Sequence, residues 1–170
     1  MALYLIANGP MPTTAAQVAV TTGTAIKTLL QVQASATNPI EIVEWGISFD
    51  GSAAATPIKV ELLETDVAAT VTASAQADIV RFDGLALANT GNQTTNQIQI
   101  GTAATGYTAT AEGTITAVRM FDVQYVAPTN QYVKQFPLGR GPVIAVAKFA
   151  RVRVTAGAAV NAYTYMIVNV

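Results

Sequence analysis

The sequence predicts one all-β domain over residues 1–170: a jelly-roll-like sandwich of two antiparallel sheets, with about ten strands and negligible helix. Two patterns predict this fold class. Apolar residues alternate with polar ones along most short segments, as in strands that bury one face. Turn signals such as Asn8-Gly9-Pro10 and Asp50-Gly51 separate these segments at regular intervals. No segment carries the apolar stripe of an amphipathic helix, and the length of 170 residues suits one domain.

The first half of the chain supplies the expected strands 2–7, 17–21, 26–33, 40–49, 58–65, 67–75 and 78–82. The segment 40–49 is the clearest of them. Its apolar phase flips between Ile42 and Val43, which indicates a β-bulge or a strand that changes sheets. The segment 67–75 has the weakest alternation.

The core prediction rests on the same clear strand. Trp45, Ile47 and Phe49 fall on one face of it because side chains alternate with a period of two. We expect these three residues to be buried together with Val152 and Val154 from a strand near the end of the chain.

Residues 88–113 form a polar excursion, uncharged until Glu112 and rich in Gly, Thr, Asn, Gln and Ala. Segments 97–100 and 107–111 are candidate strands within it. A long uncharged loop is unusual in a compact domain, so we expect this excursion to lie against a neighbouring subunit. An ordinary solvent loop with a hairpin is the alternative.

The remaining expected strands are 114–126, 131–136, 143–147, 149–155 and 163–170. Apolar residues alternate in phase along the first of them, with Phe121, Val123 and Tyr125 among them. Arg151 and Arg153 share the face opposite the valines of their strand, which is a half-buried pattern.

The composition argues against an enzyme. The chain has no histidine and no cysteine, which excludes Ser-His-Asp, Cys-His and zinc hydrolases. Two-carboxylate glycosidase chemistry stays open, but Glu41 and Glu44 bracket the change of strand phase and are expected on a solvated face. Glu61, Glu64 and Asp66 lack the oxygen spacing of a calcium loop. No cofactor and no metal are therefore predicted.

Charge is sparse and unevenly distributed. Charged residues make up 11% of the chain, against about 25% in ordinary globular domains. This suits a surface covered by neighbours, although a compositional bias of the source genome explains it equally well. Residues 1–118 hold three basic and nine acidic groups, and residues 119–170 hold six basic and one acidic. If the two parts formed separate faces, copies could associate head to tail.

Nucleic acid and membrane are not expected as partners. The net charge of −1 offers no electrostatic attraction for nucleic acid. The first residues lack the pattern of a signal peptide, and no uncharged apolar run of about 18 residues predicts a membrane-spanning helix.

Three residues are candidate contacts with partner chains. Arg140 lies between two glycines in Gly139-Arg140-Gly141, a loop tip that lacks the lysine and the following helix of a phosphate-binding loop. It is either an interface residue or plainly solvent-exposed. Gln97 and Tyr107, from the polar excursion, complete the set.

A sugar-stacking surface is the other candidate site. It would use the aromatic residues Trp45, Tyr125, Tyr132, Tyr163 and Tyr165. Core and cross-strand packing explains the same residues more simply.

Four segments, in order, carry a resemblance. They are 43–51 (Val-Glu-Trp-Gly-Ile-Ser-Phe-Asp-Gly), 57–63 (Pro-Ile-Lys-Val-Glu-Leu-Leu), 135–142 (Gln-Phe-Pro-Leu-Gly-Arg-Gly-Pro) and 151–156 (Arg-Val-Arg-Val-Thr-Ala) with Val160-Asn161. Together they resemble a family of tailed-bacteriophage structural proteins, over most of residues 40–170. The motifs are structural rather than chemical.

The resemblance implies a non-enzymatic virion component. It is most like a decoration, or cement, protein that binds the outside of a capsid and reinforces it. Its expected partners are the major capsid protein and copies of itself. The resemblance implies that the copies form a homo-oligomer, and that this is a trimer. The expected location is the capsid surface, after synthesis in the host cytoplasm. The alternative is a tail- or fibre-associated receptor- or glycan-binding β-sandwich.

Overall fold

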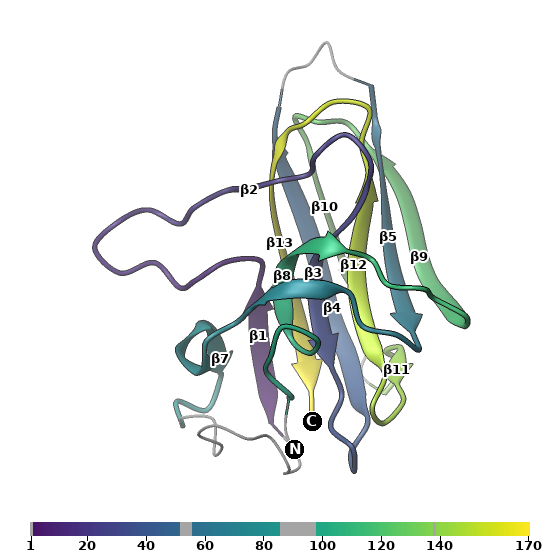
Figure 1. Cartoon of the computed structure of the whole chain (residues 1–170). Coiled ribbons are helices and arrows are strands. Elements are labelled where there is room, and N and C mark those ends of the chain that lie inside the picture. Colours follow the sequence, from purple (N-terminus) through teal and green to yellow (C-terminus); the bar gives the residue numbers. More distant parts are fainter. Residues whose placement is uncertain (1, 52–55, 86–97, 138) are drawn as a thin grey trace.

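Two antiparallel sheets pack face to face, which confirms the predicted sandwich (Figure 1). The computed structural model describes residues 2–51, 56–85, 98–137 and 139–170. Sheet A has the strand order β10-β4-β13-β1-β7, with β11 beside β4 and β2 beside β13. Sheet B has the order β6-β8-β3-β12-β5-β9.

Thirteen strands are described, so the expected total of about ten was too low. Each of the thirteen overlaps a segment that the sequence predicted as a strand. Sheet A contains β1 (Leu3–Ala7), β2 (Val20–Thr21), β4 (Ile40–Asp50), β7 (Ile79–Arg81), β10 (Gln131–Gln135), β11 (Val143–Ile144) and β13 (Asn161–Asn169). Sheet B contains β3 (Ile26–Gln33), β5 (Ile58–Thr65), β6 (Thr70–Ala73), β8 (Gly106–Ala111), β9 (Val118–Val126) and β12 (Phe149–Thr155). The one described helical segment is the short 3-10 turn η1 (Gln76–Asp78), so no described helix could span a membrane.

Some predicted strands are shorter in the structure. Of residues 17–21 only Val20–Thr21 is paired, because the preceding residues run out from the sandwich as a projecting loop with no strand beside them (Figure 1). In the candidate strand 97–100, Gln99 and Ile100 form only isolated bridges. The candidate strand 107–111 is confirmed as part of β8.

The predicted core is confirmed. Trp45, Ile47, Phe49, Val152 and Val154 are all buried in one apolar cluster between the sheets. This cluster draws side chains from both sheets, as a sandwich core requires.

The predicted bulge in β4 is also confirmed. The pairing between β4 and β13 shifts its register where Ile167 lies opposite Glu44 and Val168 opposite Ile42. Val43 is therefore the extra residue, and the strand stays in sheet A. Because of this extra residue, Ile42 and Trp45 both face the core although three positions separate them.

The described part of the polar excursion packs on its own chain. Ile98 is fully buried in the core, and β8 pairs with both β3 and β6. Ala69, Val71 and Ala109 form a second, small apolar cluster there. The segments around β6 and β8 thus cover part of the outer face of sheet B. Residues 86–97, which include the rest of the excursion up to Gln97, lie outside the described residues.

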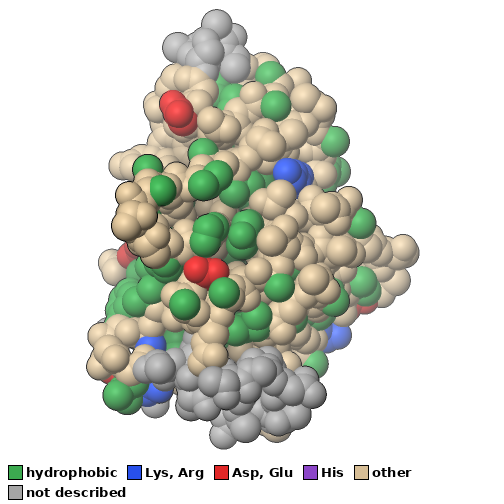
Figure 2. Space-filling model, turned by 60° about the vertical axis from the view of Figure 1, so that its left-hand side comes forward, with side chains coloured by type: hydrophobic (Ala, Val, Ile, Leu, Met, Phe, Trp, Pro, Cys, Tyr) green, Lys and Arg blue, Asp and Glu red, His purple; other side chains and the backbone are tan. Residues whose placement is uncertain are grey.

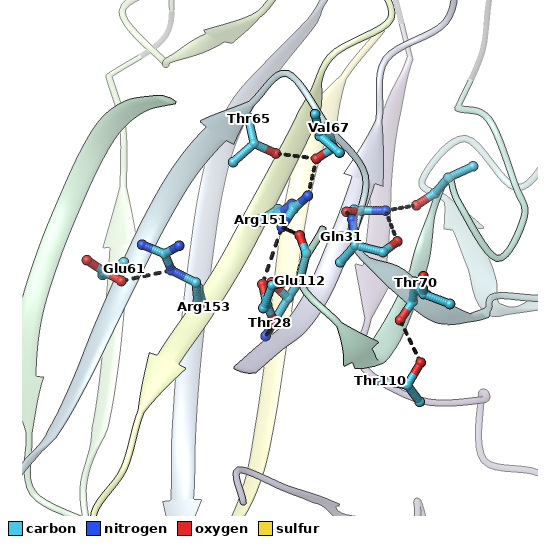
Figure 3. A network of polar contacts seen from close by, with 12 residues as sticks. Thr28, Gln31, Glu61, Thr65, Val67, Thr70, Thr110, Glu112, Arg151 and Arg153 are labelled. Carbon is cyan, nitrogen blue, oxygen red and sulfur yellow. Dashed lines mark hydrogen bonds and ion pairs between the residues drawn. The ribbon is translucent and has the colours of Figure 1, made fainter. Parts of the chain in front are cut away.

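This cover corrects the prediction for Arg151. The half-buried pattern of its strand predicted that Arg151 faces away from the core, yet its side chain is fully buried on that face, with 0% exposed. Arg151 donates to the backbone oxygens of Val67 and Glu112 and pairs with the Glu112 carboxylate at 3.3 Å (Figure 3). Thr28 donates to the same carboxylate from its backbone nitrogen at 2.5 Å and its hydroxyl at 2.6 Å. Glu112 therefore ties the end of β8 to the middle of sheet B.

Ion pairs within one chain join the acidic N-terminal part of the sequence to its basic C-terminal part. Three basic residues of the C-terminal part pair with acids of the N-terminal part, in the pairs Arg119–Glu64, Arg151–Glu112 and Arg153–Glu61. The strands of the two parts interleave in sheet B, where β12 lies between β3 and β5. The two parts of the sequence therefore do not form separate faces.

Candidate interaction surface

Strand β9 is the last strand of sheet B and turns its apolar side chains outward. Tyr125 and Val123 lie opposite Lys59 and Glu61 of β5, whereas the buried Asp122 lies opposite the core residue Leu62. Residues directly opposite each other share a face of a sheet. The usual pattern, apolar inward and polar outward, is therefore inverted in the middle of this strand.

A second bulge extends the apolar row along the strand. The pairing of β5 with β9 shifts between Leu62 and Leu63, which leaves Phe121 as the extra residue. The outward row therefore consists of Val118, Met120, Val123 and Tyr125, with exposed fractions of 56%, 59%, 36% and 73%. We call these four side chains the β9 row. A contiguous exposed apolar row of this kind is typical of protein contact sites.

Charged groups border the β9 row and are already paired. Glu61 accepts from Lys59 at 2.6 Å and from Arg153 at 3.0 Å. Burial works to raise the pKa of Glu61, but the two cations outweigh it and the pKa is lowered. Asp122 is held on the inner side by the Tyr132 hydroxyl at 2.9 Å and by Lys134 at 3.4 Å. A partner that covers the row would therefore not bury an unpaired charge.

Arg140, the first predicted contact residue, is exposed at a loop tip. Its backbone nitrogen donates to the Pro137 oxygen at 2.9 Å, and Gly139 adopts a positive φ of 71° that closes the turn. Among the described residues, no ion pair engages the Arg140 guanidinium. The loop joins β10 to β11, so Arg140 lies on the side of sheet A.

The other two predicted contacts do not join Arg140. Tyr107 lies in β8 of sheet B, opposite Leu30, and its half-buried ring packs on the core. Gln97 lies outside the described residues. The role of Tyr107 and Arg140 in contacts between chains stays a prediction.

The five aromatic residues proposed as a sugar-stacking surface are separated by the fold. Trp45 is buried in the core, where its ring centroid lies 5.4 Å from that of Tyr132. Tyr125 belongs to the β9 row on sheet B. Tyr163 and Tyr165 share the outer face of sheet A, with ring centroids 6.3 Å apart.

The candidate carboxylates are each engaged separately. Glu41 accepts from the Gly141 nitrogen at 3.0 Å, and Glu44 accepts from the Tyr165 hydroxyl at 2.5 Å. Asp66 accepts from the hydroxyl and nitrogen of Thr116 and from the nitrogen of Ala117, and these bonds lower its pKa to about 2. Within the described ranges, no three acidic side chains gather as a metal site.

Two tyrosines are expected to ionise late. Burial, and then the hydrogen bonds to Asp122 and Glu44, raise the pKa of Tyr132 and of Tyr165 to about 12 each. The stabilisation from these phenols is full below the unfolded-state pKa of about 10 and is lost as the pH rises through about 12. Titration followed by near-ultraviolet absorbance, which reports tyrosinate formation, measures the two pKa values.

The matched variant for this titration is Glu44→Gln. It removes the carboxylate that favours the protonated Tyr165, so the pKa of Tyr165 should fall while that of Tyr132 stays at about 12. Two unchanged titrations in the variant would show that the bond between Glu44 and Tyr165 is absent in solution.

Sequence reasoning missed Val118 and Met120, because the alternation along residues 114–126 does not show which face is inward. Asp122, Gln124 and Val126 alternate with Val123 and Tyr125, and the apolar set would ordinarily be taken as the inner one. The structure shows the reverse, because Asp122 and Val126 are buried.

Figure 2 shows another face of the molecule, where isolated charged groups lie among polar and hydrophobic side chains. A comparison of the chain with family models, curated proteins and solved structures found no match.

Proposed function

We propose that this protein is a non-enzymatic structural component of a tailed-phage virion, which binds the outside of the capsid and reinforces it as a decoration protein. The observation that carries the proposal is the β9 row. An edge strand that exposes Val118, Met120, Val123 and Tyr125 is suited to a surface that is covered in an assembly. The resemblance to tailed-phage structural proteins is the reason for proposing that this assembly is a phage capsid.

The expected partners are the major capsid protein and further copies of the chain, which we expect to form a trimer. Each contact can be modest because one oligomer bridges several shell subunits at once, and the linked contacts add up to a stable attachment. A contact of this kind buries at least about 1,000 Å² per interface. The β9 row would form its apolar centre, and the paired Lys59, Glu61 and Arg153 would form its polar rim.

The direct experiment mixes the purified protein with emptied, expanded capsid shells of its phage. We expect a homo-oligomer in analytical ultracentrifugation at micromolar concentration, and co-sedimentation with the shells. A monomer that does not bind the shells and is absent from purified particles would refute the proposal.

Variants of the β9 row test whether this surface makes the contact. Tyr125→Ala is expected to weaken shell binding or self-association about 30-fold, which corresponds to the loss of about 2 kcal/mol at an interface hot spot. Tyr163→Ala, an exposed tyrosine on the opposite sheet, is the matched control and should bind normally. Equal binding of the two variants would exclude the β9 row as the contact surface.

A further inference from the structure

A small hollow opens on the outer face of sheet A, on the other sheet from the β9 row. Its shape follows from the strand register, which places outward side chains of β13, β4 and β10 in two adjacent rows. The rows are Tyr163, Ser48, Gln131 and Tyr165, Gly46, Val133. The large residues lie on β13 and the smallest on β4, so the middle strand forms the floor of a trough.

Gly46 makes room for one wall of this hollow. A Cβ atom at Gly46 would lie 2.7 Å from Cε1 of Tyr165, so the Tyr165 ring occupies the space that any side chain here would fill. The Tyr165 hydroxyl donates to Glu44 at 2.5 Å, which fixes the ring over the glycine. The aromatic surface is therefore held in place by the protein itself.

Three polar groups beside the ring are uncommitted. The Ser48 hydroxyl, the Gln131 amide and the Tyr163 hydroxyl form no hydrogen bond with the described part of the chain, and all three residues line the hollow. Its volume is about 200 Å³, which is below the range of about 300–1,000 Å³ for sites that hold drug-sized ligands. The hollow thus suits one small ring with hydroxyl groups.

From this geometry we propose that the hollow binds one neutral sugar ring of a glycan. The apolar C–H face of a pyranose would lie on the tyrosine rings, and its hydroxyls would bond with Ser48, Gln131 and the Tyr163 phenol. None of the described residues that line the hollow is charged, and Glu44 beside it is already engaged by Tyr165. These groups suit a neutral ligand rather than a sialylated or phosphorylated one.

The test uses an array of immobilised oligosaccharides, with neutral hexoses and N-acetylhexosamines beside sialylated and sulfated glycans. Dense display on the array raises the signal of weak sites through multivalency. We expect binding to neutral glycans, and saturation-transfer NMR with the best of them should report contact between sugar protons and the protein. Binding restricted to charged glycans, or no binding to any glycan, would overturn the proposal.

Variants assign any binding to this hollow. Tyr163→Ala and Gln131→Ala should each weaken it about tenfold, because each removes one of the few contacts with the ring. Phe82→Ala, which removes an exposed aromatic residue outside both the hollow and the β9 row, should bind like the unaltered protein. Binding that survives Tyr163→Ala and Gln131→Ala, or that Phe82→Ala weakens equally, would place the sugar elsewhere and refute the site. Circular dichroism of each variant verifies that it is folded.

Discussion

Trp45→Ala is expected to lower the free energy of unfolding by about 3–5 kcal/mol. The Trp45 side chain is fully buried in the cluster between the sheets, beside Tyr132, and its removal would leave a cavity that the rigid strands cannot fill. The indole nitrogen has no hydrogen-bond partner in the described structure. The loss would therefore come from packing alone.

Urea denaturation of the two proteins measures this difference. Tyr125→Ala is the control, because Tyr125 is 73% exposed and exposed substitutions change stability by no more than about 0.5 kcal/mol. An unfolding midpoint that Trp45→Ala leaves unchanged would show that Trp45 does not belong to the core.

Glu112→Gln is expected to destabilise the protein by a similar amount, about 3–5 kcal/mol, because it leaves a buried charge without its partner. The Arg151 side chain is 0% exposed and that of Glu112 is 25% exposed. Burial acts to lower the pKa of Arg151, and the Glu112 carboxylate opposes this. The amide of glutamine would also turn a donor toward Thr28 or Arg151, where the carboxylate now accepts.

A double-mutant cycle separates the ion pair from general damage. The double variant Arg151→Met, Glu112→Gln should be less destabilised than the sum of the single variants, since it no longer buries an unpaired charge. Asp50→Asn is the control, because Asp50 is exposed and forms no ion pair with the described residues, and substitutions at such positions change stability by about 0.5 kcal/mol or less. Additive losses in the cycle would show that Arg151 and Glu112 are not coupled.

Strand β4 shows how far sequence reasoning can reach. Its apolar residues change phase once, between Ile42 and Val43, which predicted either a bulge or a change of sheet, and the register with β13 shows the bulge. The alternation of Trp45, Ile47 and Phe49 with polar or small residues made the burial of Trp45 predictable, because all three fall on one apolar face.

Strand β9 and Arg151 show where that reasoning stops. A period of two along β9 shows which side chains share a face but not which face points inward. That depends on how β9 pairs with β5. The burial of Arg151 depends on Glu112, which lies 39 residues away and reaches it only after β8 has folded over sheet B. The hollow on sheet A likewise depends on register among three strands that are distant in the sequence.

The central positions of β12 and β13 have a consequence for how the chain folds. Both strands come late in the sequence, yet β12 lies between β3 and β5, and β13 lies between β4 and β1. Sheet B therefore cannot close until residues up to 155 have left the ribosome, and sheet A not until residues up to 169 have done so. Until then the earlier strands have unpaired edges. Folding that depends on such distant pairings is slow, on the order of milliseconds to seconds. During that interval the nascent chain depends on dilution or chaperones to avoid pairing with other copies.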